Sequence, residues 1–185
     1  MDSPDAVSVL AQSISSFGML HLNAFDEIVL LCIGTDRSIG DALGPLVGSY
    51  VSEGASGGYR VLGTLESPVH ASNLAETLEW VQGGLRRPMV IAVDACLGRV
   101  ESVGMLTVGR GSLKPGAGVN KTLPAVGQVY VTGVVNVGGF MEYFVLQNTR
   151  LSLVMRMARV VAEGVAQGLD ALVQNRMTLR PATEV

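Results

Sequence analysis

Two runs of the chain are apolar at every position, and they limit what it can fold into more than any other feature. One spans Ile28–Ile33 and the other spans Met89–Val93. A strand without a polar face needs cover on both sides, which is typical of central strands in parallel sheets. The sequence therefore predicts strands at 27–33 and 88–93 that are buried on both faces.

The rest of the chain alternates between strand-like and helix-like segments. Shorter strands are predicted at 60–64, 104–108 and 128–135, and helices at 42–53, 71–81, 139–148 and 150–172. This alternation is typical of a mostly parallel sheet with helices on both faces. The predicted fold class is α/β, a three-layer α/β/α sandwich with a mostly parallel sheet.

A length of 185 residues fits one domain. We expect an N-terminal helical extension over 1–24, a single α/β domain over 25–175 and a tail over 176–185. The N-terminus lacks the basic segment of a signal peptide, and no apolar run approaches the ~18 residues that span a bilayer. We therefore expect a cytoplasmic protein without a membrane partner.

Composition excludes several classes of protein. Hydrophobic residues make up 48% and charged residues 16%, which argues against disorder. The net charge is -3 and no basic cluster exceeds Arg86-Arg87, so we expect no nucleic-acid partner. The two cysteines, Cys32 and Cys96, lie in or beside apolar runs, which fits a reducing compartment rather than a disulfide scaffold.

Ligands of such sheets bind at the carboxyl ends of the strands, which here are three loops. These loops are 34–44, 94–97 and 136–140. The first has neither the phosphate-loop pattern nor the dinucleotide pattern, and it carries two aspartates where an anion would bind. A fourth segment, 109–128, is a long irregular loop that could close over a substrate.

Asp41 and Asp94 are the candidate catalytic residues. If the strands at 27–33 and 88–93 are neighbours, their carboxyl ends bring both carboxylates into one cleft. Two carboxylates ~4 Å apart repel by about 4 kcal/mol at an effective dielectric of ~20, so one would keep a proton near neutral pH. Such a pair serves as general acid and general base, or grips a divalent metal. Asp41 is alternatively a helix N-cap, and Asp94 alternatively caps the next turn.

Substrate binding is assigned to polar residues and glycines of the same loops: Thr35, Asp36, Ser38, His70, Asn73, Asn136, Gly138 and Gly139. His70 is alternatively a residue that bonds locally at the start of a helix. The amides near Gly138 and Gly139 either bind a carbonyl or an anion, or form a turn that needs glycine. Cys96 is an alternative nucleophile, although no nucleophile elbow or metal-ligand spacing supports other covalent or zinc chemistry.

Four motifs in order resemble one family. The segments Gly34–Pro45, Ser67–Leu74, Ala92–Ala95 and Gly133–Glu142 are similar to those of the sporulation protein YyaC family, which is labelled a spore protease. The motifs also resemble those of germination protease and of hydrogenase maturation endopeptidases. The latter add a histidine in a later loop, whereas this sequence has none after His70.

The resemblance implies a phosphorylase/hydrolase-like fold and a peptidase of sporulation or germination that uses Asp41 and Asp94. It also implies a location in the forespore or spore interior and a protein or peptide substrate. No cofactor is expected, or else a divalent metal held by the same two aspartates, and a homodimer is an open expectation. The alternative function is a non-catalytic sporulation protein that uses the cleft for peptide binding or assembly.

Overall fold

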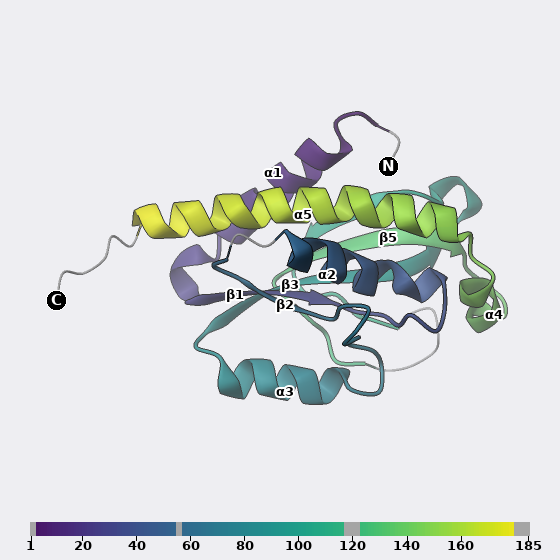
Figure 1. The fold of residues 1–185 in the computed structure, drawn as a ribbon, viewed down its shortest axis with the longest axis horizontal. Helices are drawn as coiled ribbons and strands as arrows, with labels where there is room; N and C mark the ends of the chain where they lie inside the picture. Colours follow the sequence, from purple (N-terminus) through teal and green to yellow (C-terminus); the bar gives the residue numbers. More distant parts are fainter. Residues whose placement is uncertain (1–2, 55–56, 117–122, 180–185) are drawn as a thin grey trace.

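The structure is a computed structural model that describes residues 3–54, 57–116 and 123–179. Its five-stranded sheet has the order β2-β1-β3-β5-β4, in which β4 is antiparallel to β5 and the other pairs are parallel (Figure 1). The strands are β1 (Glu27–Cys32), β2 (Arg60–Leu62), β3 (Pro88–Gly98), β4 (Leu106–Arg110) and β5 (Val129–Val137). Since β2 and β3 lie on opposite sides of β1, the sheet changes its winding direction between β1 and β3, as a ligand-binding α/β sheet does.

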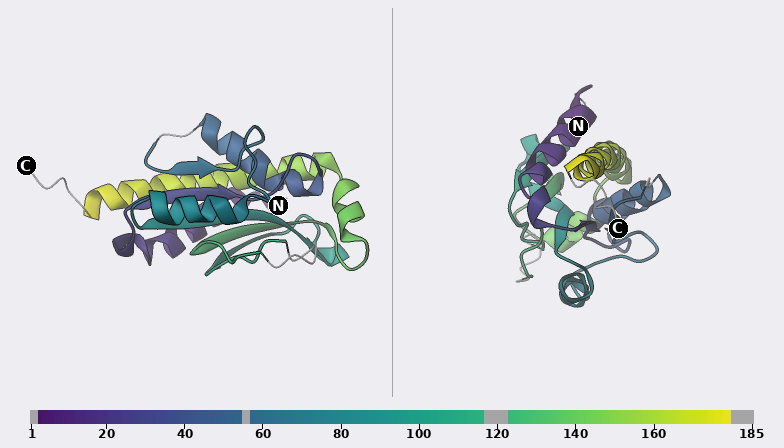
Figure 2. Two further views of the ribbon diagram at one scale, coloured as in Figure 1. Left: turned by 90° about the horizontal axis from the view of Figure 1, so that it is seen from below. Right: turned by 90° about the vertical axis from the view of Figure 1, so that its left-hand side faces the viewer.

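Helices cover both faces of this sheet, which confirms the three-layer α/β/α architecture. One face carries α1 (Ala6–Met19), α2 (Leu43–Glu53) and α5 (Leu151–Leu179), and the other carries α3 (Leu74–Gly84), as Figure 2 shows end-on. The short α4 (Glu142–Gln147) lies at the end of the sheet where β3 and β5 finish (Figure 1). In the described part of the chain, no helix has the length and apolarity needed to cross a bilayer.

The continuous apolar character of the central strands has a direct cause in the two cores. Ile28 and Leu30 of β1 point into the core beneath α1, α2 and α5, while Val29 and Leu31 point into the core beneath α3. Side chains of a strand alternate between faces, so a strand covered on both faces has no place for a polar residue. The prediction of doubly buried strands is therefore confirmed.

The observed element ends differ from the predicted ones where long-range pairing extends or replaces local signals. β3 does not end at Asp94 but continues to Gly98, because β5 pairs with it as far as Gly98. α3 begins at Leu74 rather than at 71, since a turn held by the Leu74 amide and the His70 carbonyl precedes it. The predicted helices at 139–148 and 150–172 are observed as α4 and α5, and α5 continues to Leu179.

The predicted loop at 109–128 has more structure than the sequence suggests. β4 runs to Arg110, and Leu113 and Val126 exchange two backbone hydrogen bonds of 2.8 Å, so the segment folds back as a hairpin. Leu113 packs beside buried Val126 in the core beneath α3. Residues 117–122, at the centre of the predicted loop, lie outside the described part of the chain.

Candidate functional site

Asp94 owes its place to the different lengths of two neighbouring strands. β1 pairs with β3 as far as Cys32 opposite Val93, and Asp94 is the next residue of β3. Its carboxyl group therefore lies just past the end of β1, on the α3 face of the sheet that Val90 and Ala92 share. Only 6% of Asp94 is exposed, and its Oδ1 accepts a hydrogen bond of 2.9 Å from the Ala95 amide.

Asp41 is held beside the end of β1 by backbone contacts. The Thr35 amide donates to the Asp41 carbonyl at 3.1 Å, and the Asp41 amide donates to the Ser38 carbonyl at 3.0 Å. Gly34 has a φ of +144°, and a Cβ there would lie 2.0 Å from the Asp41 carbonyl oxygen. Glycine at this position is therefore what allows the loop to close tightly over the strand end.

The N-cap interpretation of Asp41 is wrong. Asp41 lies inside a 3-10 turn, Gly40–Ala42, and α2 begins one residue after that turn with Ala42 as its N-cap. The N-cap residues of the 3-10 turn and of α2 are Ile39 and Ala42, so Asp41 caps neither. Its carboxyl group lines the pocket described below.

Close contact between α2 and the strand ends fixes the turn that carries Asp41. A Cβ on Gly44 would lie 2.1 Å from the Ile33 carbonyl oxygen, and one on Gly48 would lie 2.2 Å from the Gly63 carbonyl oxygen. The helix thus rests directly on backbone, without side chains between. This contact leaves little freedom for the helix start to move relative to β1.

Both aspartates line one pocket of about 170 Å³ at the carboxyl end of the sheet. The pocket gathers residues of β3, β5, the hairpin after β4, the 3-10 turn and α4. Its lining consists of Asp41, Asp94, Ala95, Cys96, Leu97, Leu113, Lys114, Gly116, Thr132, Glu142 and Leu146. The carboxyl groups of Asp41 and Asp94 therefore share this pocket with Glu142, Lys114 and several apolar side chains.

The two carboxyl groups differ in their electrostatic surroundings. Burial raises the pKa of Asp94 well above its ordinary value, and the negative charge of Asp41 raises it further, against a smaller opposing effect of the Ala95 amide. Burial also raises the pKa of Asp41, but the nearby charge of His70 lowers it. Because two like charges in one site cannot both ionise easily, these surroundings favour a proton on Asp94 over one on Asp41.

Several of the predicted binding residues support the site through the backbone rather than line the pocket. Thr35 and Ser38 hold the turn of Asp41, as described above, whereas Asp36 is exposed. His70 interacts with Asp41 by its charge, and its own loop is held by Asn73, whose Oδ1 accepts from the His70 amide at 2.8 Å. His70 therefore lies near Asp41 but outside the pocket lining.

The polar groups at the end of β5 form hydrogen bonds with other parts of the same chain. The Asn136 side chain donates to the Val145 carbonyl at 3.3 Å and to the Thr149 hydroxyl at 3.2 Å, which ties α4 to β5. The Gly138 amide donates to the Gly98 carbonyl at 2.8 Å, and the Gly139 amide donates to Glu142 Oε1 at 3.2 Å. Asn136, Gly138 and Gly139 therefore do not line the pocket, and these two amides already have acceptors.

Four polar residues of the lining were not foreseen as binding residues. Thr132 pairs in register with Asp94, so its place follows from the neighbouring strand. Lys114 and Glu142 arrive from the hairpin and from α4, and no local pattern marks them. Burial raises the pKa of the Cys96 thiol and the charge of Asp94 raises it further, although a hydrogen bond from Thr132 lowers it. This thiol stays protonated, which disfavours the nucleophile alternative.

The pocket offers a metal ion the carboxylates of Asp41 and Asp94, and Glu142 is the third acidic residue of its lining. Their oxygens suit a hard divalent cation. Among residues 3–54, 57–116 and 123–179, however, no group of three or more histidine, cysteine, aspartate or glutamate side chains is arranged to hold a metal ion.

The chain is similar to known proteins in both sequence and structure. Residues 3–164 match the family described as "Protein of unknown function (DUF1256)". "Uncharacterized protein YyaC" of Bacillus subtilis (strain 168) is 58% identical over 147 residues, which are 80% of this chain and 72% of the relative. The crystal structure of a NiFe hydrogenase maturation protease, HycI from Thermococcus kodakarensis KOD1, has 17% identity and a TM-score of 0.48, covering 82% of this chain and 99% of that chain.

Proposed function

We propose that this chain, which belongs to the DUF1256 family, hydrolyses peptide bonds of a protein substrate. One observation carries the proposal. The carboxyl groups of Asp41 and Asp94 share a pocket, where burial raises the pKa of Asp94 well above its ordinary value and His70 opposes the smaller rise in the pKa of Asp41. An acid and a base in one enclosure are what the addition of water to a carbonyl group requires.

The roles of the two residues follow from their exposure and neighbours. Asp41 accepts a proton from a water molecule, whose oxygen then attacks the peptide carbonyl carbon. Asp94 donates its proton to the carbonyl oxygen and gives a tetrahedral gem-diol. Transfer of a proton from Asp41 to the amide nitrogen and return of a hydroxyl proton to Asp94 break the carbon–nitrogen bond. The products are a carboxylic acid and an amine, and both carboxyl groups regain their initial states.

The neighbouring groups favour this division of work. The charge of His70 opposes the rise that burial causes in the pKa of Asp41, which favours Asp41 over Asp94 as the base. The Ala95 amide fixes the orientation of the Asp94 carboxyl group. Leucine side chains on the pocket walls lower the local dielectric, which strengthens the interaction of both groups with a reacting carbonyl.

The motifs shared with the sporulation protein YyaC family support a substrate from sporulating or germinating cells. The proposed location is accordingly the forespore or the spore interior, and the proposed reaction uses no cofactor. A divalent metal bound by Asp41 and Asp94 would instead supply a Lewis acid at the carbonyl oxygen.

The test is cleavage by the purified full chain. Small acid-soluble spore proteins and fluorescein-labelled β-casein are incubated with it between pH 5 and pH 8, and fragments are identified by mass spectrometry. We expect discrete fragments, and a loss of rate of at least about 100-fold in Asp41→Asn and in Asp94→Asn. Asp36→Asn is the matched control, because Asp36 is exposed and outside the pocket.

Parallel reactions with a chelator and with added Mg²⁺, Mn²⁺ or Zn²⁺ separate the metal-free reaction from the metal-dependent one. If a chelator abolishes cleavage and a metal restores it, the two aspartates bind a metal ion rather than share a proton. Absence of cleavage for both substrates at every pH and with every metal would favour the alternative, a peptide-binding protein without catalysis.

A further inference from the structure

The short helix α4 forms a wall of the pocket, although it has little stability of its own. Glu142 and Leu146 of α4 line the pocket. The helix has six residues, and its N-cap residue, Met141, has no side-chain oxygen to accept a helix N–H. Met141 also has a left-handed backbone, with a φ of 52°. Because a helix of this length does not form in isolation, its position depends on contacts with the rest of the chain.

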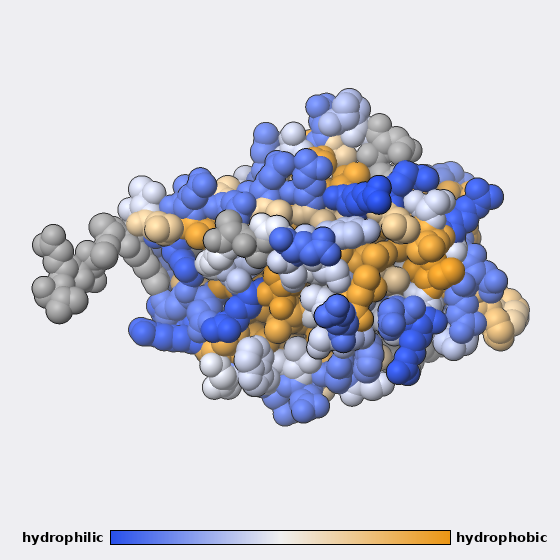
Figure 3. Space-filling model, in the orientation of Figure 1, coloured by the Kyte–Doolittle hydropathy of each residue, from blue (hydrophilic) through white to orange (hydrophobic). Residues whose placement is uncertain are grey.

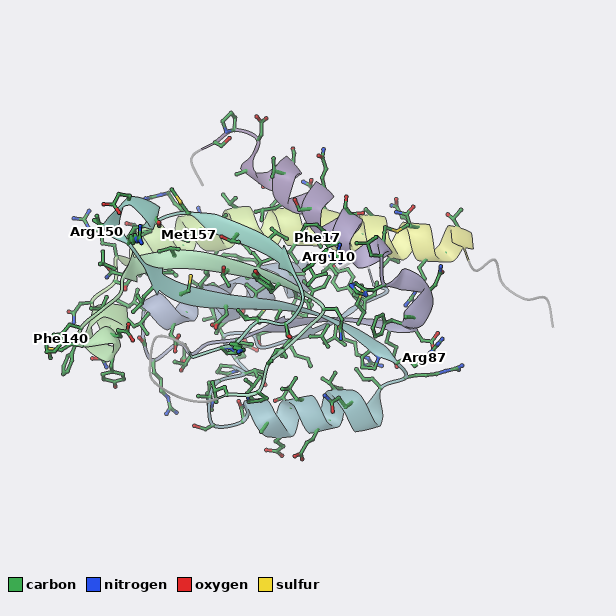
Figure 4. All side chains as sticks on the ribbon, turned by 180° about the vertical axis from the view of Figure 1, so that it is seen from behind. Phe17, Arg87, Arg110, Phe140, Arg150 and Met157 are labelled. Atoms are coloured by element: carbon green, nitrogen blue, oxygen red, sulfur yellow. The ribbon has the colours of Figure 1, made fainter. Side chains whose placement is uncertain are left out.

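The outer side of α4 faces solvent at one end of the molecule. In Figure 3 this end projects from the surface beside the place where Figure 1 draws α4. Figure 4 shows Phe140, the residue two positions before the helix, at the tip of the molecule and away from the sheet. Tyr143 and Phe144 of the helix are exposed. The contacts that hold α4 in place therefore come from its inner side.

The side-chain amide of Asn136 is a polar anchor on this inner side. Asn136 is the penultimate residue of β5, and its Nδ2 donates to the Val145 carbonyl at 3.3 Å and to the Thr149 hydroxyl at 3.2 Å. The Thr149 hydroxyl donates to the same Val145 carbonyl at 2.9 Å. Thr149 is 4% exposed, so loss of the amide would leave its hydroxyl short of a partner in a place that water hardly reaches. These three hydrogen bonds hold the end of α4 against β5.

The anchored end of α4 packs directly on the turn that carries Asp41. A Cβ on Gly40 would lie 2.8 Å from Leu146 Cδ2 and 2.9 Å from Thr149 Oγ1. Gly40 is buried, and it is the first residue of the 3-10 turn and the neighbour of Asp41. The turn of Asp41 is therefore held by β1 and α2, as described above, and also by α4. Any movement of α4 away from β5 would release this second contact.

We propose that Asn136 is a positioning residue, which keeps α4 against the 3-10 turn and thereby fixes Asp41 relative to Asp94. Asn136 lies outside the pocket lining, so it acts through α4 rather than by contact with a substrate. The role needs an amide, because a hydrocarbon side chain or an ionised carboxylate has no N–H to donate to a carbonyl and a hydroxyl. The proposal deepens the proposed function and rests on it only for the effect on hydrolysis.

The first measurement is amide hydrogen exchange, followed by NMR in the full chain and in Asn136→Ala. This change removes both hydrogen bonds from residue 136 to α4 and Thr149. The amides of Thr35 and Asp41 report on the turn, because they donate to carbonyls within it. We expect their exchange to accelerate at least about tenfold more than that of the amides of β3, which report on global unfolding.

The second measurement is the carbon-13 titration of the Asp94 carboxyl group. Burial raises the pKa of Asp94, and α4 contributes to the walls that enclose it. Loosening of α4 in Asn136→Ala should admit water to the pocket and lower the pKa of Asp94 toward its ordinary value. A role of Asn136 in overall stability alone would leave this titration of the folded chain unchanged.

Asn148→Ala is the matched control. The Asn148 side chain is exposed and also donates to a carbonyl of α4, that of Phe144 at 2.8 Å, but this bond stays at the end of the same helix. The control should leave exchange in the turn and the Asp94 titration as in the parent. Thr149→Val removes the hydroxyl at nearly constant volume and should reproduce the effect of Asn136→Ala, whereas Thr149→Ser keeps the hydroxyl and should behave like the parent. This pair keeps the test decisive if Asn136→Ala does not fold.

The proposal is overturned by equal acceleration in the turn and in β3, or by an unchanged Asp94 titration, in the folded variants among Asn136→Ala and Thr149→Val. Equal behaviour of Thr149→Ser and Thr149→Val would also overturn it. Both measurements need no substrate, so a parent chain without peptidase activity contradicts the proposed function alone. With an active parent, kcat should fall at least about tenfold in Asn136→Ala, and an unchanged kcat would contradict this proposal alone.

Discussion

Asp94 places a carboxyl group where a folded protein tolerates charge least. The residue is 6% exposed, and the negative charge of Asp41 adds to the penalty for its ionisation. The folded state therefore binds this proton more tightly than the unfolded state, whose pKa is near 3.8. The resulting stability is fully present below that pKa and is lost as the pH rises through the folded pKa. The chemistry proposed for the site thus works against the stability of the fold.

Asp94→Asn should stabilise the protein at neutral pH. Asparagine keeps an oxygen acceptor for the Ala95 amide and removes the group that resists ionisation. We expect the free energy of unfolding at pH 7–8 to exceed that of the unmutated chain by about 1 kcal/mol or more, with the difference shrinking as the pH falls to the unfolded pKa of 3.8 and below. Urea unfolding across this pH range measures it, with Asp36→Asn as a control for the loss of one exposed carboxylate. A variant that is less stable than the parent at pH 8 would contradict the assigned burial penalty.

His70→Gln should raise the pKa of Asp41. The charge of His70 lowers that pKa, so its removal leaves the burial effect unopposed. Under the proposed mechanism, the acidic limb of the pH–rate profile should then move to higher pH, because Asp41 must be ionised to act as base. Carbon-13 NMR of the Asp41 carboxyl group measures the same change without any substrate. Ser72→Ala is the control in the same loop, and an unchanged Asp41 titration in His70→Gln would refute the coupling.

At the scale of elements, the contact between α2 and β1 fixes the position of Asp41, one of the two candidate catalytic residues. The glycines at 34 and 44 allow backbone to meet backbone, so that the turn of Asp41 closes over the strand end. Strand β3 carries Asp94, the other candidate catalytic residue, past the end of β1, because β3 is longer than β1 and continues to pair with β5. The site is therefore a product of unequal strand lengths and of one close helix–strand contact.

Gly44→Ala should destabilise the chain by more than about 2 kcal/mol. The new Cβ would lie 2.1 Å from the Ile33 carbonyl oxygen, and α2 could accommodate it only by moving away from β1. Gly54→Ala, at the end of the same helix, is a matched control because its Cβ meets no atom within 4 Å. We expect that variant within about 0.5 kcal/mol of the parent in thermal unfolding. Similar losses in the two variants would show that glycine content, rather than the close contact, matters.

How much of the structure the sequence predicts also differs between elements. The apolar runs predicted β1, β3 and their neighbours correctly, since double burial leaves a visible pattern. The apolar run ends before Asp94, so the sequence did not predict the last part of β3. That part forms by pairing with β5, which lies far away in the chain. Asp41 and Asp94 could be placed together because strand ends converge in such sheets. Lys114 and Glu142 could not, because a hairpin and a left-handed residue at Met141 bring them to the pocket.

For the molecule as a whole, the first helix is part of the main core. Leu10 and Ile14 of α1 are buried, and they pack against Gly164 and Gly168 of α5, where a Cβ would come within 3 Å of their side chains. α5 in turn covers the sheet with a buried stripe that includes Val161. Helix α1 therefore packs along α5 on the same face of the sheet and also contacts β4 and β5. The sequence predicted the N-terminal helix but not which surface it covers.

Ile14→Ala should cost about 2–4 kcal/mol of unfolding free energy. The side chain is fully buried between α1 and α5, so its truncation leaves a cavity at the centre of this contact. Val9→Ala on the same helix is the control, since Val9 is 58% exposed and should change stability by no more than about 0.5 kcal/mol. Guanidinium unfolding followed by the fluorescence of Trp80 measures both. A loss below about 1 kcal/mol in Ile14→Ala would show that α1 is a dispensable appendage.

The pocket draws on five separate stretches of chain, and the last of them ends at Leu146. During translation the two aspartates leave the ribosome well before Thr132, Glu142 and Leu146 exist to enclose them. A nascent chain therefore carries both reactive groups without the surroundings that give them different proton affinities. Under the proposed mechanism, hydrolysis at this site therefore cannot begin before Leu146 has emerged from the ribosome.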